Sequence, residues 1–262
     1  MSSPNVDNYC NGKDNRYIVK QDNNWFNPYK WEQLIEWVSS SEVISEDIFI
    51  DLPEEHNPIP HMERIPCVYD RVLFESYTSF KVIVDLKDNM TIKSLRIWDQ
   101  YYSTQDFKDF TDSDIGKLLF TINGNIENLI IDNNMICKDK TGCVCGNEEP
   151  TIMQKVCNYV QKYGCPSLEC SDPIKPVGHC CPICASMLTI SYKNDFSIDL
   201  ITGITTAYLN HKEYSTIKSY LHKLKSRKFQ FIVTDLANKG LADKLVNSIK
   251  QYFNDGIELC YY

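Results

Sequence analysis

The sequence has little that would bind phosphate, nucleic acid or an anionic membrane. Glycine is scarce, at 10 of 262 residues, and Asn238-Lys239-Gly240 has a single glycine where a phosphate loop needs several. We predict a helix start there instead. Acidic residues outnumber basic ones by 35 to 27, for a net charge of −8. Because nucleic acids and anionic membranes attract basic surfaces, neither is expected as the main ligand, and the short basic run Lys223 to Lys228 is interpreted as a solvated helix end.

Signatures of hydrolytic enzymes are missing as well. The 5 histidines are scattered along the chain, and no two have the i, i+4 spacing of a zinc protease. No serine lies in a G-x-S-x-G turn. Acidic pairs such as Glu54-Glu55 lie in polar loops, where solvated carboxylates are ordinary. We therefore expect no enzymatic activity, no cofactor and no resident metal.

Long apolar runs do not occur either. Residues 1–5 (MSSPN) carry no apolar core of an export signal, and no window approaches the roughly eighteen apolar residues of a membrane span.

Cysteine, by contrast, is abundant. The chain has 12 cysteines, and eight of them lie in residues 143–184. Structural zinc usually takes pairs of ligands two to four residues apart, and the region offers one such pair, Cys181 and Cys184. Neighbouring side chains such as Cys180 and Cys181 point apart, which suits two adjacent disulfides. We predict disulfides, at Cys143, Cys145, Cys157, Cys165, Cys170, Cys180, Cys181 and Cys184; a metal site of His179, Cys180 and Cys184 is the alternative.

Disulfides would place the protein in an oxidising compartment, the secretory pathway or outside the cell. The sequon Asn89-Met90-Thr91 fits this and predicts N-glycosylation of Asn89. Because no export signal is visible, we expect the chain to be part of a longer protein.

The remaining sequence predicts a multi-domain, mainly β protein. Residues 1–24 are a polar lead-in, and 25–136 read as short alternating strands with Asn, Asp and Gly corners, which favours a β-solenoid or an irregular sandwich. Residues 137–184 are the cysteine-rich module. In 185–262, strands at 188–192, 229–233 and 257–261 alternate with helical patterns at 201–224 and 241–249, which predicts a β-α-β-α-β domain.

Four stretches, taken in order, resemble the amnionless family, and the similarity extends over most of residues 8–262. They are Trp25 to Trp31, residues 65–74 (IPCVYDRVLF), residues 79–82 (SFKV) and residues 142–147 (GCVCGN). The Cys180-Cys181-x-x-Cys184 ending resembles a von Willebrand factor type C module, which this family carries at the same place.

The resemblance implies a non-enzymatic ectodomain that partners the endocytic receptor cubilin. It implies a β-solenoid-like front part that holds a cubilin trimer, then the cysteine-rich module and a membrane-proximal α/β domain. A transmembrane helix and a cytoplasmic tail with endocytic signals would follow, and of two front repeats only the second is expected here. The implied location is the apical plasma membrane and endosomes, with uptake of proteins and, in vertebrates, of the cobalamin carrier.

The resemblance also implies a disulfide pairing. Cys67 would bond to Cys137, and the eight cysteines of 143–184 would pair among themselves. Cys10 would lack its partner and Cys260 has no counterpart, although these two could also bond to each other.

The residues expected to contact cubilin lie on one face of the predicted strands and at the aromatic segment before them. Core packing is the alternative role for each of them. They are Trp25, Trp31, Val72, Phe74, Phe80, Val82 and Val84.

Two other functions stay open at this point. One is a secreted antagonist that binds growth factors of the bone morphogenetic family through the type C-like module. The other is an intracellular protein that stores metal or is structured by zinc.

Overall fold

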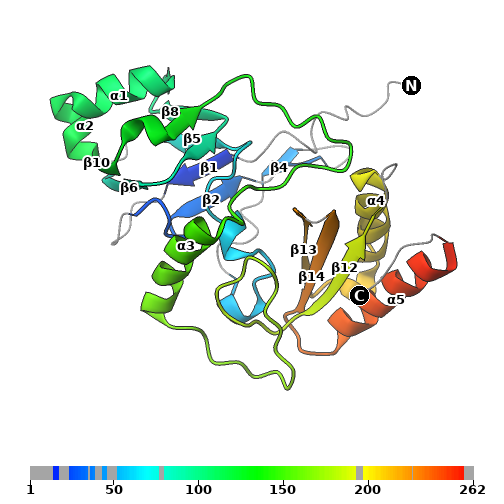
Figure 1. Ribbon diagram of the computed structural model, residues 1–262. Coiled ribbons are helices and arrows are strands. Elements are labelled where there is room, and N and C mark those ends of the chain that lie inside the picture. The colour runs from blue at the N-terminus through cyan, green and yellow to red at the C-terminus, as the bar shows by residue number, and fades with distance from the viewer. Residues whose placement is uncertain are drawn as a thin grey trace. The chain divides into compact units, whose positions relative to one another are not determined.

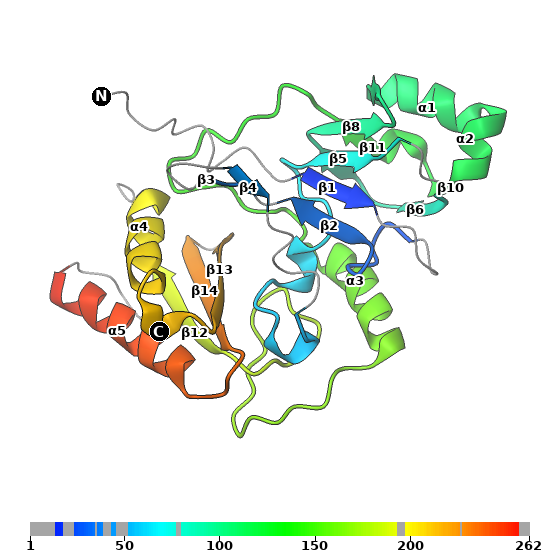
Figure 2. The same ribbon diagram turned by 180° about the vertical axis from the view of Figure 1, so that it is seen from behind.

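The structure, a computed structural model, describes residues 14–17, 24–34, 36–38, 43–45, 52–76, 80–192, 197–225 and 227–256. The chain divides into two compact units (Figures 1 and 2). Unit 1 comprises residues 1–50, 61–137 and 145–163, and unit 2 comprises 51–60, 138–144 and 164–262. Most of the predicted lead-in, both Cys10 and Cys260, and the predicted strand 257–261 lie outside the described residues.

Unit 1 is built from small sheets. The largest has the strand order β2-β1-β5-β8-β9, from β1 (Asp14–Tyr17), β2 (Trp31–Leu34), β5 (Arg71–Phe74), β8 (Ser94–Ile97) and β9 (Gln100–Tyr102). The other sheets have two strands each: β6 (Val82–Leu86) with β10 (Phe120–Gly124), β7 (Met90–Ile92) with β11 (Leu129–Ile131), and β3 (Glu36–Val38) with β4 (Val43–Ser45).

Three parallel pairings repeat along unit 1. Strand β5 pairs with β8, β6 with β10 and β7 with β11, so the chain runs twice along a similar three-strand path. The prediction of a strand-rich region is confirmed. The finer prediction of a β-solenoid is not confirmed. The described residues of unit 1 form one five-stranded sheet and several two-stranded sheets, without the continuous stacked sheets of a solenoid.

Three helices of unit 1 were not predicted: α1 (Thr104–Asp112), α2 (Asp114–Leu119) and α3 (Pro150–Tyr163). Their start signals are present in the sequence. Ser103 and Asp106 form a capping box at α1, Ser113 caps α2, and α3 has proline at its first position. Helix α2 directly precedes β10, and the 3₁₀ turn Ile126–Asn128 directly precedes β11.

The core of unit 1 is aromatic. The alternation along β6 is confirmed, since Val82, Val84 and Leu86 are buried and the residues between them are half-exposed. Phe74 stacks on Phe80 with ring centroids 4.6 Å apart. Burying large aromatic side chains is among the strongest contributions to a core, so this cluster holds the small sheets together.

Unit 2 is an antiparallel sheet covered on one face by two helices. The strand order is β12-β14-β13, from β12 (Ser186–Ser191), β14 (Lys228–Asp235) and β13 (Ile217–Leu224). Helices α4 (Ile198–Leu209) and α5 (Leu241–Gly256) lie on the same side of the sheet (Figure 1). Residues of all five elements share one buried cluster that includes Ile201, Phe231 and Leu245.

The predicted order of unit 2 is wrong in one place, because residues 217–224 form a strand and not a helix. The described order is therefore β-α-β-β-α. The spacings of three and four residues among Ile217, Leu221 and Leu224 match those of an amphipathic helix. The segment is a strand because it pairs along its length with the buried strand β14. The described residues of the basic run 223–228 accordingly lie where β13 ends and β14 begins, and not at the end of a helix.

The predicted helix start after Asn238 is confirmed, since α5 begins at Leu241. The carboxylate of Asp235 accepts backbone N–H bonds from Ala237, Lys239 and Leu241 at 3.1, 2.8 and 3.1 Å. Asn238 and Gly240 have positive φ, 50° and 72°, which the turn into the helix requires. Further 3₁₀ turns span Glu54–His56, His61–Glu63 and Lys212–Tyr214.

The two units divide the predicted cysteine-rich module. Residues 145–163 belong to unit 1, whereas 138–144 and 164–184 belong to unit 2. The boundaries 137 and 184 of an independently folding module stay a prediction.

Candidate functional site

Two sequence motifs that lie far apart in the chain meet in unit 1. Cys67 forms a disulfide with Cys145, with their Cα atoms 4.8 Å apart at a sequence separation of 78. Next to this bond, the N–H of Val68 donates to the carbonyl oxygen of Cys145 at 3.0 Å. A covalent bond and a backbone hydrogen bond thus join the start of β5 to the segment before α3.

Buried polar groups complete this junction. The side-chain amide of Asn147, 5% exposed, donates to the carbonyl oxygens of Met62 at 2.9 Å and Pro66 at 3.1 Å. The carboxylate of Asp70, 2% exposed, accepts the N–H of Cys67 at 2.8 Å. Because an unpaired buried polar group costs about 1–3 kcal/mol, these bonds specify one geometry. We call residues 62–70 with 145–147 the Cys67 clamp.

Gly146 is required in the Cys67 clamp. Its φ is +93°, a region that other residues rarely adopt, and a Cβ added there would lie 2.5 Å from Cγ2 of Val68. The glycine therefore permits the close approach of the two segments.

The Cys67 clamp is not a metal site. Glu63, Cys67 and Cys145 place a carboxylate oxygen and two sulfurs within 4.8 Å of one another. The two sulfurs are bonded to each other, so neither supplies the thiolate that a zinc ion needs.

The predicted disulfide chemistry is confirmed for all ten predicted cysteines. The structure pairs Cys165 with Cys181 and Cys170 with Cys184, in addition to Cys67 with Cys145. Also disulfide-bonded are Cys137, Cys143, Cys157 and Cys180. The alternative metal site of His179, Cys180 and Cys184 is excluded in the disulfide-bonded protein, because both cysteines are oxidised. His179 is buried, and its Nε2 lies 3.4 Å from the carbonyl oxygen of Pro58.

The pairing implied by the resemblance is wrong. Cys67 bonds to Cys145 and not to Cys137, and the eight cysteines of 143–184 are not self-contained, since Cys145 bonds outside that region. The spacing of cysteines does not determine connectivity. Here the hydrogen bonds of Val68 and Asn147 place Cys145 beside Cys67.

A second polar cluster lies in unit 2. The Lys223 side chain is 10% exposed, and its Nζ donates to Asp139 Oδ2 at 2.6 Å, Thr141 Oγ1 at 2.6 Å and the carbonyl oxygen of Gly142 at 2.8 Å. Nζ also lies 5.7 Å from the centre of the Tyr192 ring. These contacts tie residues 139–142 to the sheet.

The charges in this cluster shift both pKa values. Burial opposes ionisation of Asp139, but the hydrogen bonds from Lys223 and Thr141 prevail and lower its pKa from 3.8 to about 2. Burial likewise opposes the charge on Lys223, but its bonds to Asp139 and Tyr192 raise the pKa of the ammonium. Both groups are therefore charged near neutral pH.

A third contact ties the end of the cysteine-rich region to the same sheet. Gln230 of β14, 1% exposed, accepts the N–H of Val177 at 3.0 Å and donates to its carbonyl oxygen at 3.3 Å. The amide nitrogen of Gln230 also lies 3.0 Å from Nε2 of His222. The Gln230 side chain thus pairs both backbone polar groups of Val177.

The structure places the residues predicted to contact cubilin in the core of unit 1. Their burial removes them from the outer surface of the folded unit and corresponds to the core-packing alternative. The exposed fractions are 0% for Trp25, 5% for Trp31, 0% for Val72, 1% for Phe74, 5% for Phe80, 0% for Val82 and 0% for Val84. Asn89, by contrast, is exposed in the bend between β6 and β7.

Sequence reasoning missed the polar partners of both clusters. Asn147 is the last residue of the motif 142–147, but no role was assigned to this asparagine from the sequence. Lys223 was interpreted as part of a solvated run, and its burial depends on a hairpin that was not predicted.

The two units together define a class of protein: a disulfide-cross-linked, strand-rich chain with a small antiparallel α/β unit. The family model for Amnionless matches residues 2–258. The chain belongs to the Amnionless family.

Individual relatives agree with this assignment. Protein amnionless of Sus scrofa is 28% identical over 167 residues, which cover 62% of this chain and 31% of the relative. Protein amnionless of Canis lupus familiaris is 27% identical, covering 63% and 36%, and that of Drosophila melanogaster is 22% identical, covering 69% and 31%. The chain spans about a third of the length of the curated relatives it matches. No helix among the described residues is long and apolar enough to span a membrane.

Proposed function

We propose that this chain is part of a non-enzymatic, amnionless-like receptor subunit that binds cubilin and serves receptor-mediated protein uptake. Membership of the Amnionless family is the observation that carries the proposal. Anchoring in the apical plasma membrane, trafficking to endosomes and, in vertebrates, uptake of the cobalamin carrier belong to the longer protein.

The surface that supports partner binding best is an open strand edge in unit 1. Within the described part of the chain, β10 is hydrogen-bonded to β6 on one side and to no strand on the other. An exposed edge of this kind accepts an added strand from a partner. The partner proposed here is the N-terminal segment of cubilin, as a trimer.

Exposed apolar side chains lie on the elements before and after β10. Leu118 of α2 is 73% exposed and Ile130 of β11 is 43% exposed. Strand addition combines backbone hydrogen bonds with side-chain contacts, and these two exposed side chains, close to β10 in sequence, are proposed to supply the apolar contacts.

The seven buried residues named above have an indirect part in this proposal. Trp31, Phe74 and Phe80 form the core beneath the sheets, and the ring of Phe120, the first residue of β10, lies 5.4 Å from that of Phe74. They therefore hold the edge in place without contacting the partner.

Binding to the N-terminal segment of cubilin tests the proposal. The chain with Leu118→Glu and Ile130→Lys is expected to bind at least tenfold more weakly than the unchanged chain, measured by surface plasmon resonance. Tyr252→Glu, at a 49% exposed position of unit 2, is the matched control and is expected to bind normally.

Two results of this binding experiment would count against the proposed function. Equal binding by all three chains would remove the β10 edge from the proposal, and no binding by the unchanged chain would remove cubilin. Binding of a growth factor of the bone morphogenetic family in its place would favour the antagonist function.

A further inference from the structure

Charge of one sign gathers along β13 and its connection to β14. Residues 217–228 (IKSYLHKLKSRK) contain five lysines and arginines and no aspartate or glutamate, in a chain whose net charge is −8. Lys225 and Arg227 are exposed, and Lys228 is half-buried. Short runs rich in lysine and arginine are one of the patterns that bind polyanions, and the fold around this run favours such a role.

The fold brings a second basic segment beside this run. Asp139 accepts a hydrogen bond from Lys223 Nζ at 2.6 Å, at a sequence separation of 84. Lys138 and Lys140 lie on either side of Asp139 in the chain, and both are exposed. The two segments together form a surface that we call the basic edge, made of Lys138, Lys140, Lys225, Arg227 and Lys228.

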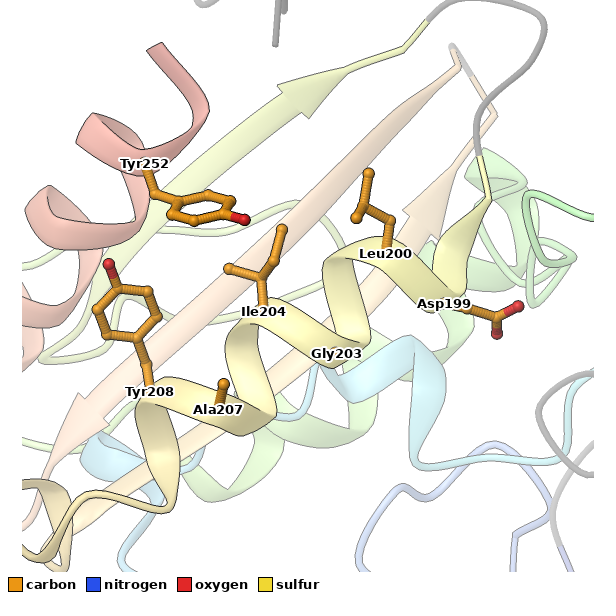
Figure 3. Close-up of a pocket in the computed structure, with 7 residues that line it drawn as sticks. All are labelled: Asp199, Leu200, Gly203, Ile204, Ala207, Tyr208 and Tyr252. Carbon is orange, nitrogen blue, oxygen red and sulfur yellow. The ribbon is translucent and has the colours of Figure 1, made fainter. Parts of the chain in front are cut away.

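Two carboxylates beside the basic edge have hydrogen-bond partners of their own. Asp139 is bonded to Lys223, as described above. Asp199 lies near Lys140, because the N–H of Ile198 donates to the carbonyl oxygen of Lys140 at 3.2 Å. The Asp199 carboxylate accepts the Ser197 hydroxyl at 3.0 Å and, at the start of α4, points away from the side of that helix that faces α5 (Figure 3).

Positive charge therefore remains in excess where these segments meet. Residues 138–142, 197–199 and 217–228 carry seven lysines and arginines against the two carboxylates just described. Because the chain as a whole is acidic, attraction of a polyanion to this surface would be a local property and not a result of net charge.

Arg227 occupies a position at which folding alone favours glycine. Three residues, 225–227, connect β13 to β14, and hairpin loops of that length commonly include a residue of positive φ, for which glycine is preferred. Arg227 has a φ of 55°. A residue with a Cβ is strained in this conformation, and strain of this kind gathers at functional sites. An arginine retained here points to a use for its charge.

The chemistry of the basic edge suits a sulfated polysaccharide. Its charges are spread over two segments of the chain, which fits a linear polyanion better than a small anion. Lysine and arginine bind the oxygens of an anionic group through charge-assisted hydrogen bonds, and arginine does so with two parallel bonds. Disulfides persist in oxidising compartments, on the opposite side of the membrane from the anionic lipids of the cytoplasmic leaflet. A sulfated glycan is the polyanion that this setting favours.

We propose that the basic edge binds a sulfated glycosaminoglycan, with Lys140, Lys225 and Arg227 contacting its sulfate groups. The surface belongs to unit 2, so it is independent of the β10 edge proposed to bind cubilin in unit 1. The competing ligand is an anionic membrane surface.

Binding to immobilised heparin tests this proposal. The chain with its disulfides intact is compared by surface plasmon resonance with a basic-edge variant, Lys140→Gln with Lys225→Gln and Arg227→Gly. The basic-edge variant is expected to bind at least tenfold more weakly, and the unchanged chain is expected to bind desulfated heparin at least tenfold more weakly than heparin. Raising the salt concentration should weaken heparin binding by the unchanged chain, because ions screen exposed charges.

A matched control removes the same charge elsewhere in unit 2. Lys212→Gln, Lys239→Gln and Lys250→Gln change three exposed lysines outside the basic edge, and this variant is expected to bind heparin like the unchanged chain. Equal losses in the basic-edge and control variants would overturn the proposal, because overall charge would then govern binding. Binding of the unchanged chain to vesicles of phosphatidylserine and phosphatidylcholine, without binding to heparin, would overturn it in favour of a membrane surface.

Arg227→Gly on its own separates binding from folding. It is expected to weaken heparin binding while the unfolding temperature stays the same or rises, because glycine adopts a positive φ without strain. Unchanged heparin binding together with a lower unfolding temperature would show that the arginine serves the hairpin, and would remove it from the site.

Discussion

Lys223 Nζ lies 2.6 Å from Asp139 Oδ2 and joins the hairpin of the unit 2 sheet to the segment before Gly142. The Asp139 pKa is about 2 in the folded chain against an ordinary 3.8. A carboxyl group whose pKa is lowered by folding stabilises the fold above its ordinary pKa, and that contribution disappears as pH falls through the folded value. Stability should therefore decline between about pH 4 and pH 2.

Asp139→Asn is expected to destabilise unit 2 at pH 7 by about 1 kcal/mol, a figure reduced for solvent screening because the Asp139 side chain is 51% exposed. The variant should also lose its part of the decline between pH 4 and pH 2. Urea unfolding at several pH values, with disulfides intact, measures both effects. Asp172→Asn, at an exposed position of the same unit, serves as the control. Equal stability of the two variants would contradict this prediction.

The disulfide of the Cys67 clamp gives a second prediction. Peptide mapping without reductant should recover Cys67 joined to Cys145. Replacing both by serine should lower the free energy of unfolding by about 4 kcal/mol, given the 78-residue separation. Recovery of Cys67 joined to Cys137 would restore the pairing that the resemblance implied.

Asn147 provides a test of the clamp that leaves the sulfurs untouched. Asn147→Ala should cost about 2 kcal/mol in the free energy of unfolding, because the carbonyl oxygens of Met62 and Pro66 lose a buried donor. Asn133→Ala, at an exposed position, should change it by less than about 0.5 kcal/mol. Denaturant unfolding compares the two, and similar small losses would show that the clamp depends on the disulfide alone.

Asn89 provides a test of the secretory route. When the chain is expressed with an added export signal in cells that N-glycosylate, it should carry one glycan at Asn89 that peptide N-glycosidase removes. Asn89→Gln and Thr91→Ala should abolish this glycan, and Thr91→Ser should retain it, because the sequon accepts either hydroxyl residue. An unchanged gel mobility in all four chains would refute the prediction.

Local patterns predicted the elements whose side chains alternate or repeat clearly. The buried positions of β6 and the start of α5 after Gly240 follow directly from the sequence. The strand β13 could not be predicted in the same way, because Ile217, Leu221 and Leu224 fit a helix equally well until β14 lies beside them. The pairing of β13 with β14 determines that this segment is a strand, and the spacing of apolar residues within the segment does not reveal that pairing.

The candidate site shows the same division. Its sulfur chemistry could be predicted from cysteine density, whereas the partner of Cys67 could not, because it depends on Val68 and Asn147 meeting across about 80 residues. The partner-contact prediction selected residues by their apolar alternation, and that pattern identifies buried positions more directly than binding surfaces.

The bond between Cys67 and Cys145 also bears on how the protein withstands proteolysis. It encloses β5 to β11 and both helices between them in one covalent ring. A protease that nicks an exposed turn inside this ring, such as Asn133–Asn134, leaves the two fragments attached to each other. Damage of this kind would release no piece of the strand-rich unit until a reductant reaches the sulfurs.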